Sequence, residues 1–173
     1  YVILEGRASL GGTWDLFRYP GLRSDSDMKT MAYKFKPWQG DKSLADGSSI
    51  LSYLYETAIE NKIDQNIRYQ HHVKSAEWSS AENIWTIEVL RKDTNEMIEM
   101  SCNFILICAG YYSYKGGYTP NFKGRDDFKG QVIHPQAWPE DLDYSNKRVV
   151  VIGSGATAVT LIPALTSKTE HVT

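Results

Sequence analysis

The chain has 173 residues, of which 42% are hydrophobic and 12% aromatic, enough apolar material for the core of one domain or of two interlocked pieces. The formal net charge is -2 and no basic block occurs, which argues against nucleic acid or an anionic membrane surface as the main partner. No apolar run approaches the roughly 20 residues of a membrane span, and no signal-peptide pattern opens the chain, so we expect a soluble, cytoplasmic protein.

The two cysteines, Cys102 and Cys108, both lie in stretches that are typical of strands. A disulfide framework or a four-ligand metal site needs more cysteines than this, so we interpret both as small apolar side chains. His71 and His72 are adjacent, and neighbouring positions on a strand point to opposite faces, with no third ligand at a suitable spacing. We therefore predict no metal site.

The first predicted element is a strand over residues 1–4, an apolar run that ends at Glu5. This is the form of the second strand of a nucleotide-binding βαβ unit, in which an acidic residue at the strand end binds a ribose. A glutamate at a strand end is also commonly just solvated. The first strand and the glycine turn of such a unit do not precede Glu5, so we expect the chain to be a fragment of a longer protein.

Residues 6–28 have neither a helical nor a strand period, and Pro20–Gly21 predicts a turn within them. The segment is too rich in aromatic residues and leucine for disorder, and a long structureless segment of a compact domain is usually functional. We interpret it as a cofactor-wrapping loop. Gly11–Gly12 permits close backbone approach, Trp14 offers an aromatic face, and Arg7 is one of three arginines suited to phosphate or carboxylate. A packed surface loop is the alternative.

A helix with an apolar stripe from Ile50 to Ile63 is predicted next, with Asp46 or Ser48 as its N-cap. Short runs that are rich in β-branched and aromatic residues follow, separated by polar turns. These runs predict an antiparallel β-meander inserted between helical units. The predicted strands are residues 67–69, 73–78, 84–90 and 97–102.

Residues 104–108 predict a fully apolar strand of the kind that is buried on both faces of a parallel sheet. Ala109 and Gly110 follow it, and small residues there let a ligand approach the carboxyl end of the strand, where open α/β sheets bind ligands. Most of the chain from there to Lys147 is predicted as loop. Within it His134 is a candidate base, although a histidine beside proline is more often a hydrogen-bonded hinge residue, and Trp138 is a candidate wedge under the next sheet.

The clearest nucleotide-binding signal is the apolar run 149–152 followed by Gly153-Ser154-Gly155-Ala156-Thr157-Ala158. In a βα turn of this form the first glycine allows the turn, the second lets the backbone approach a pyrophosphate, and a small third residue, here Ala158, lets the helix pack on the strand. The amide groups of the first helical turn lack partners within the helix and suit phosphate oxygens. A plain structural corner is the alternative. About 20 residues after Gly153, residues 171–173 predict the start of the next strand.

Four motifs that span almost the whole chain resemble those of the class B flavoprotein monooxygenases, which include flavin-containing and Baeyer–Villiger monooxygenases. The last motif resembles the fingerprint of the family in its Baeyer–Villiger form, because Trp-Pro closes it. The motifs are Leu10-Gly11-Gly12-Thr13-Trp14, Arg18-Tyr19-Pro20-Gly21 with Asp25, Cys108-Ala109-Gly110-Tyr111, and Phe128-x-Gly130-x-x-x-His134-x-x-x-Trp138-Pro139.

The resemblance implies an α/β, Rossmann-like, two-dinucleotide-binding flavoprotein fold that is incomplete here and carries an antiparallel β-meander insertion. Residues 1–127 are then a partial FAD-binding domain, residues 128–146 a fingerprint linker, and residues 147–173 the start of an NADP-binding Rossmann domain. The implied parent is an FAD- and NADPH-dependent monooxygenase that inserts one oxygen atom from O2 into a ketone, aldehyde or heteroatom substrate.

Two alternatives stay open. One is another two-dinucleotide-binding flavin oxidoreductase, such as a disulfide reductase, which would need a redox pair of cysteines near the flavin. The other is a folded remnant without catalytic activity. We expect the 173-residue chain by itself to be inactive and to retain flavin weakly or not at all.

Carried over by position, the resemblance implies that Glu5 binds a ribose of FAD and that residues 12–14 run along its pyrophosphate and flavin. It implies that Ser24–Asp25 lies near the isoalloxazine ring. It assigns the adenine to the backbone of Val73 and the NADPH pyrophosphate to residues 153–157. Asp25 and His134 are the catalytic candidates. The resemblance favours a structural role for the Asp25 carboxylate. For His134 it favours a hinge or cofactor-positioning role over direct proton transfer. The predicted cofactor-binding residues are Glu5, Arg7, Gly12, Thr13, Trp14, Ser24, Asp25, Val73, Ala109, Gly110, Tyr111, Gly153, Ser154, Gly155, Ala156 and Thr157.

Overall fold

The computed structural model describes residues 1–173, and the chain forms two compact units. The first unit contains residues 1–12 and 54–111, and the second contains residues 13–53 and 112–173. These units do not follow the domain limits predicted at residues 127 and 146, which stay a prediction about the full-length protein. No helix of the chain is both long and apolar enough to cross a bilayer.

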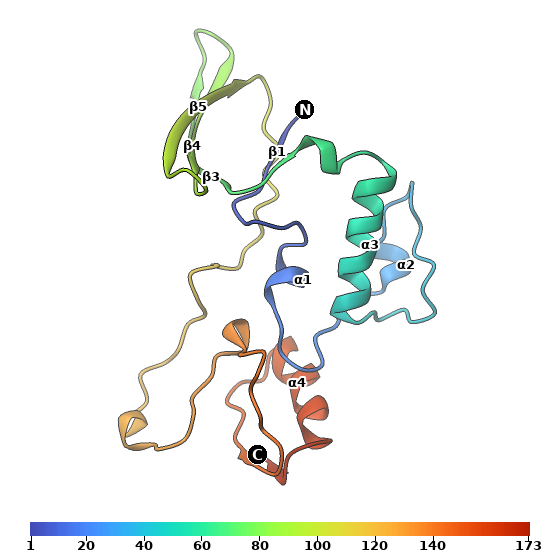
Figure 1. The fold of residues 1–173 in the computed structure, drawn as a ribbon, viewed down its shortest axis with the longest axis vertical. Helices are drawn as coiled ribbons and strands as arrows, with labels where there is room; N and C mark the ends of the chain where they lie inside the picture. The colour runs from blue at the N-terminus through green and yellow to red at the C-terminus, as the bar shows by residue number, and fades with distance from the viewer. The chain divides into compact units, whose positions relative to one another are not determined.

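The first unit is built around the predicted β-meander, which the structure confirms (Figure 1). Strands β3 (His71–Ser79), β4 (Ile84–Arg91) and β5 (Glu96–Cys102) pair antiparallel in that order. Asn83 and Asn95 lie in the connecting turns with φ angles of 55° and 56°, a left-handed conformation that asparagine tolerates. Alternation along β4 buries Ile87 and Val89, the latter completely.

The strand predicted at residues 67–69 lies outside this meander. Strand β2 (Ile67–Arg68) follows a short 3₁₀ helix, η1 (Asp64–Asn66), and pairs in parallel with β1 (Ile3–Leu4). Gln70, with φ of 59°, lies between β2 and β3, so the chain changes direction there and the two strands join different sheets. The prediction of one continuous meander from residue 67 was therefore wrong.

The prediction of a buried strand at residues 104–108 was also wrong. The segment has no strand structure, and Phe104, Leu106 and Ile107 are 80%, 78% and 82% exposed. A strand needs hydrogen-bonding neighbours, and no strand of the chain pairs with this segment. Cys108 is exposed, so its interpretation as a strand residue with a small apolar side chain was wrong. Cys102 does lie in a strand, β5. Both cysteines are free thiols.

The second unit begins with short helices in the segment that was predicted to lack periodicity, which corrects that prediction. They are α1 (Thr13–Leu16) and α2 (Met28–Met31), each about one turn long. The side chain of Asp27 caps α2 by accepting a hydrogen bond from the Lys29 amide at 2.9 Å. Helix α3 (Gly47–Glu60) confirms the predicted helix but ends three residues earlier, before Lys62 with its φ of 56°.

The C-terminal part of the second unit confirms the predicted glycine turn and helix, but the strand predicted over residues 149–152 is shorter, because residues 150–152 are not in a strand. Strand β6 (Arg148–Val149) leads to α4 (Ala156–Thr166), which Figure 1 shows in red, and β7 (His171–Val172) pairs in parallel with β6. The 3₁₀ helices η2 (Arg125–Asp127) and η3 (Pro135–Ala137) interrupt the preceding loop. One buried cluster of the unit consists of Phe17, Tyr19, Leu161 and Leu165, with Trp138, Val149, Val151 and Val172 among the residues packed against it.

Candidate dinucleotide-binding site

The glycine turn between β6 and α4 leaves open space where a phosphate group would approach. Gly153 has φ of 145°, in the region that favours glycine, whereas Gly155 has φ of -77° and serves as the N-cap of α4. A Cβ atom added at either glycine would meet nothing within 4 Å. Both positions are thus free of protein atoms on the side where a side chain would otherwise stand.

The N-terminus of α4 has no side-chain cap. The first helical hydrogen bond runs from the Val159 amide to the Gly155 carbonyl at 3.2 Å, so the amides of Ala156, Thr157 and Ala158 come before that bond. Such amides lie at the positive end of the helix dipole and are the usual ligands of phosphate oxygens. The turn therefore has the chemistry that a dinucleotide pyrophosphate requires.

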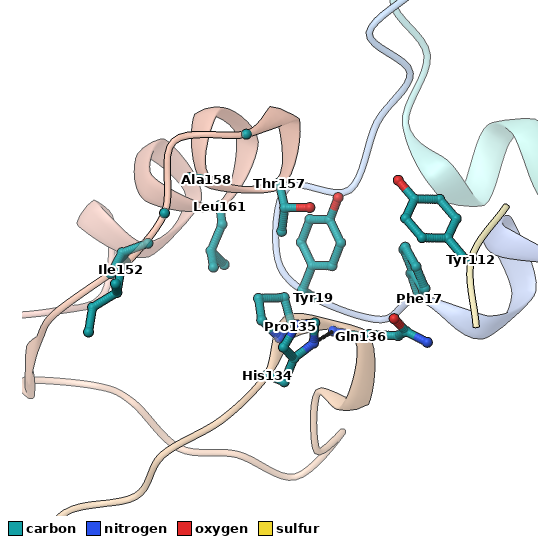
Figure 2. A pocket seen from close by; sticks show the side chains of 13 residues that line it. Phe17, Tyr19, Tyr112, His134, Pro135, Gln136, Ile152, Thr157, Ala158 and Leu161 are labelled. Atoms are coloured by element: carbon teal, nitrogen blue, oxygen red, sulfur yellow. Dashed lines mark hydrogen bonds between the residues drawn. The ribbon is translucent and has the colours of Figure 1, made fainter. Parts of the chain in front are cut away.

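A pocket of about 200 Å³ opens beside this turn, and Figure 2 shows its walls. One wall is aromatic, with Phe17 and Tyr112 in an edge-to-face contact at a centroid distance of 5.1 Å. The polar residues of the wall are His134, Gln136 and Thr157. The remaining lining residues are Tyr19, Pro135, Val151, Ile152, Gly153, Gly155, Ala158 and Leu161.

His134 is held on both edges of its imidazole ring. Its Nδ1 atom accepts a hydrogen bond from the Gln136 amide at 3.2 Å, which caps η3 (Figure 2). A Cβ atom on Gly117 would lie 1.9 Å from the His134 Cε1 atom and 2.1 Å from Nε2, so a side chain at residue 117 would require the ring to shift. The Gln136 side chain also donates a short hydrogen bond to the Ser113 carbonyl. These contacts favour a positioning role for His134 over proton transfer.

Ser24 and Asp25 lie on a segment that is anchored but does not line this pocket. Ser24 is 5% exposed, and its Oγ atom accepts a hydrogen bond from the Ala45 amide at 3.0 Å. Arg23 forms an isolated antiparallel bridge with Asp46. Asp25 is exposed in this chain, directly beside the buried serine. Trp14, in α1, is likewise absent from the pocket wall.

Several predicted FAD residues of the first unit, among them Glu5, Arg7 and Gly12, lie around the end of β1. The Glu5 carboxylate accepts a hydrogen bond from the Arg7 amide at 2.8 Å. The Arg7 guanidinium donates a hydrogen bond to the Gly12 carbonyl at 3.1 Å. The His71 amide donates to the Glu5 carbonyl at 2.9 Å, which brings β3, and with it Val73, to the same corner. The Ala109–Tyr111 segment is exposed and irregular, and Gly110 has φ of 73°.

Acidic and basic groups both lie around this corner, since the Lys92 ammonium group donates to the Gly6 carbonyl at 2.8 Å. Burial raises the pKa of Tyr69, and the nearby Tyr55, Glu5 and Asp64 raise it further, so the phenol stays neutral at neutral pH. Only one oxygen of the Glu5 carboxylate is used by Arg7, which leaves acceptor capacity for hydroxyl groups. The free acceptor capacity of Glu5 suits ribose hydroxyl groups.

The structure adds residues that the sequence did not single out. Phe17, Tyr112 and Gln136 line the pocket, and Gly117 supports His134. The only sequence signal for Gln136 was its place inside the fingerprint motif, and the aromatic residues lie in segments without periodicity. No group of three or more histidine, cysteine, aspartate or glutamate side chains lies close enough to hold a metal ion.

A parallel strand-turn-helix-strand unit with an open, uncapped helix N-terminus defines a dinucleotide-binding α/β protein. The family model described as FMO-like, flavin-binding monooxygenase-like, matches residues 23–173. The chain belongs to this family of flavin-binding monooxygenase-like proteins, which confirms the resemblance seen in its motifs.

The relatives are longer than this chain. It is 59% identical over 174 aligned residues to the FAD-containing monooxygenase EthA of Mycolicibacterium smegmatis, and the match covers all of this chain and 35% of that protein. Among solved structures, an oxidized steroid monooxygenase bound to NADP is 32% identical with a TM-score of 0.81, over 99% of this chain and 33% of that one. Cyclohexanone monooxygenase from Rhodococcus sp. Phi1 bound to NADP+ is 30% identical with a TM-score of 0.77, over 99% and 32%. These likenesses confirm the predicted fold class.

Proposed function

We propose that the full-length protein is an FAD- and NADPH-dependent monooxygenase that transfers one oxygen atom from O2 to a ketone, aldehyde or heteroatom substrate. The observation that carries the proposal is the open glycine turn at the uncapped N-terminus of α4. The FAD-containing relative EthA and the NADP-bound steroid and cyclohexanone monooxygenases support it. In this proposal residues 1–127 belong to the FAD domain, residues 128–146 link the domains, and residues 147–173 begin the NADP domain.

When bound, NADPH supplies a hydride and FAD accepts it and activates O2. The amides of residues 156–158 hold the NADPH pyrophosphate, because they precede the first helical hydrogen bond and no side chain competes for them. Gly153 and Gly155 leave the space that the phosphates need. The aromatic wall of the pocket beside the turn excludes water and offers ring faces to a planar group.

On the FAD side, the Glu5 carboxylate accepts hydrogen bonds from ribose hydroxyl groups. The Arg7 amide uses one oxygen of this carboxylate, so acceptor positions stay open for the ribose. Arg7 holds the Gly12 carbonyl, so it fixes the backbone over which the cofactor runs. Gln136 bonds the fingerprint segment to Ser113, and His134, which accepts the Gln136 amide and lies against Gly117, keeps that pocket wall in place. Asp25 contributes negative charge from a segment whose backbone is anchored at Ser24.

The test uses the full-length protein. A bound-flavin absorption spectrum, together with O2 consumption that depends on NADPH, is the expected result, with NADH as the comparison for coenzyme preference. Candidate ketones, aldehydes and thioethers then identify the substrate class by product analysis. NADPH oxidation that makes dithiols without O2 uptake would contradict the proposal and support a disulfide reductase. A full-length protein without flavin would support a non-catalytic role.

A further inference from the structure

The turn that contains Gly21 lies directly on helix α4. Gly21 has φ of +79°, and a Cβ atom there would lie 2.3 Å from the Thr160 carbonyl oxygen and 2.9 Å from the Ala164 Cβ atom. Since Cβ atoms essentially never approach other heavy atoms within 3.0 Å, even an alanine would force the turn and the helix apart by at least about 0.7 Å. The absence of a side chain at Gly21 therefore sets the distance between this turn and α4.

The residues after Gly21 are anchored on their other side. The Gly47 amide donates to the Leu22 carbonyl and the Ser24 amide donates to the Ala45 carbonyl, both at 2.9 Å. The Ala45 amide in turn donates to the buried Ser24 Oγ atom at 3.0 Å. Three hydrogen bonds within three residues leave this segment little freedom to adjust, so the shift that a side chain at Gly21 requires falls on α4.

We infer that Gly21 and Ser24 are positioning residues for flavin reduction: Ser24 anchors the segment, and Gly21 lets helix α4, whose N-terminus binds the NADPH pyrophosphate, lie against that segment at a fixed distance. This inference rests on the proposed function. Hydride transfer requires the donor and acceptor carbons within about 3.5 Å, and a misplacement of about 1 Å costs roughly a hundredfold in rate. The displacement forced by one methyl group at Gly21 is of that order.

The chain contains a matched control for the substitution. Gly124 has φ of +81°, and a Cβ atom there would meet only the Asp127 carboxylate, at an ordinary 3.7 Å. Gly124→Ala and Gly21→Ala thus impose the same left-handed backbone strain, but only Gly21→Ala adds the contact with α4. A difference between the two variants isolates the contact.

The experiment measures anaerobic flavin reduction of the full-length holoenzyme by saturating NADPH in a stopped-flow instrument. In Gly21→Ala we expect FAD content to be retained and the reduction rate to fall roughly tenfold to a hundredfold. Gly124→Ala is expected to reduce at the wild-type rate. Reduction by dithionite, which needs no nicotinamide site, is expected to be unchanged in both variants. Equal NADPH reduction rates in the two variants would overturn the inference.

A second pair of variants applies if Gly21→Ala does not fold. Ser24→Ala adds no atoms and removes the acceptor of the Ala45 amide, so we expect slower reduction by NADPH with FAD retained. Ser79→Ala removes a similar acceptor, of the Glu82 amide at 3.3 Å, at an exposed site and serves as its control. Equal rates in this pair also overturn the inference. A wild-type enzyme that NADPH does not reduce refutes the proposed function itself.

Discussion

Gly155→Ala is predicted to weaken NADPH binding without destabilising the protein. The φ and ψ angles of Gly155, -77° and -178°, are open to alanine, and the added methyl group would meet no atom within 4 Å. Replacing glycine by alanine at an N-cap costs about 1 kcal/mol or less. Alanine also lowers the conformational entropy of the unfolded chain, which offsets this cost by about 0.4–1 kcal/mol. The free energy of unfolding should therefore stay close to that of the wild type.

The binding loss follows from where the methyl group stands. It fills open space at the N-cap, next to the α4 amides to which the proposal assigns the pyrophosphate. One hydrogen bond to a charged group contributes about 1.5–3 kcal/mol, so losing one should raise the Kd for NADP+ roughly tenfold to 150-fold. Gly153→Ala is different, because φ of 145° strains the folded chain as well, and it should lower both stability and affinity.

The assay needs two measurements on the full-length holoenzyme. Thermal unfolding reports stability, and titration with NADP+ reports the Kd, with the KM for NADPH in O2 uptake as an independent check. FAD content is the internal control, because the α4 turn is assigned to the other dinucleotide. If Gly155→Ala folds like the wild type and binds NADP+ with the same Kd, then the pyrophosphate does not lie on α4.

Three further predictions concern other parts of the chain. Asp25→Ala should keep FAD bound yet slow flavin reduction by NADPH roughly tenfold, about 1.4 kcal/mol, because the resemblance implies that this acid pairs with an active-site arginine; stopped-flow kinetics measure it. Leu165→Ala removes a side chain that is 1% exposed and should lower the free energy of unfolding by about 2–5 kcal/mol in urea titrations. The hydrogen bond from the Arg91 side chain holds the pKa of Asp93 below its usual value. The ionised Asp93 therefore stabilises the folded chain at a pH above its unfolded-state pKa. This stabilisation is lost as the pH falls through the lower folded-state pKa. Asp93→Asn should therefore flatten the acid-unfolding curve below about pH 4.

Matched substitutions control these predictions. Asp41→Ala removes another exposed loop aspartate, and if it slows flavin reduction as much as Asp25→Ala, the special role of Asp25 is lost. Val159→Ala truncates a side chain on the same helix as Leu165 that is 60% exposed, so its effect on stability should be within about 0.5 kcal/mol. An acid-unfolding curve that is the same for Asp93→Asn and wild type would contradict a contribution of the Arg91 contact to stability.

The sequence alone was sufficient for elements whose signal lies in adjacent residues. The glycine turn at residues 153–155, helix α4 and the three strands of the β-meander were all predicted, because backbone angles at glycine and the periods of helix and strand are local properties. The ordered motifs led to the correct family, since each motif preserves a short backbone geometry. The fingerprint located His134 but not the groups around it.

Tertiary structure decided everything that depends on a partner far along the chain. The apolar composition of residues 104–108 is that of a buried strand, yet the segment is exposed because composition does not supply a neighbouring strand. The contact of Gly21 with Thr160 and the support of His134 by Gly117 join residues that are well separated in sequence, and neither has a local signal. Side-chain and backbone contacts of this kind arise only when distant segments pack at van der Waals distance, and that distance is a property of the folded chain.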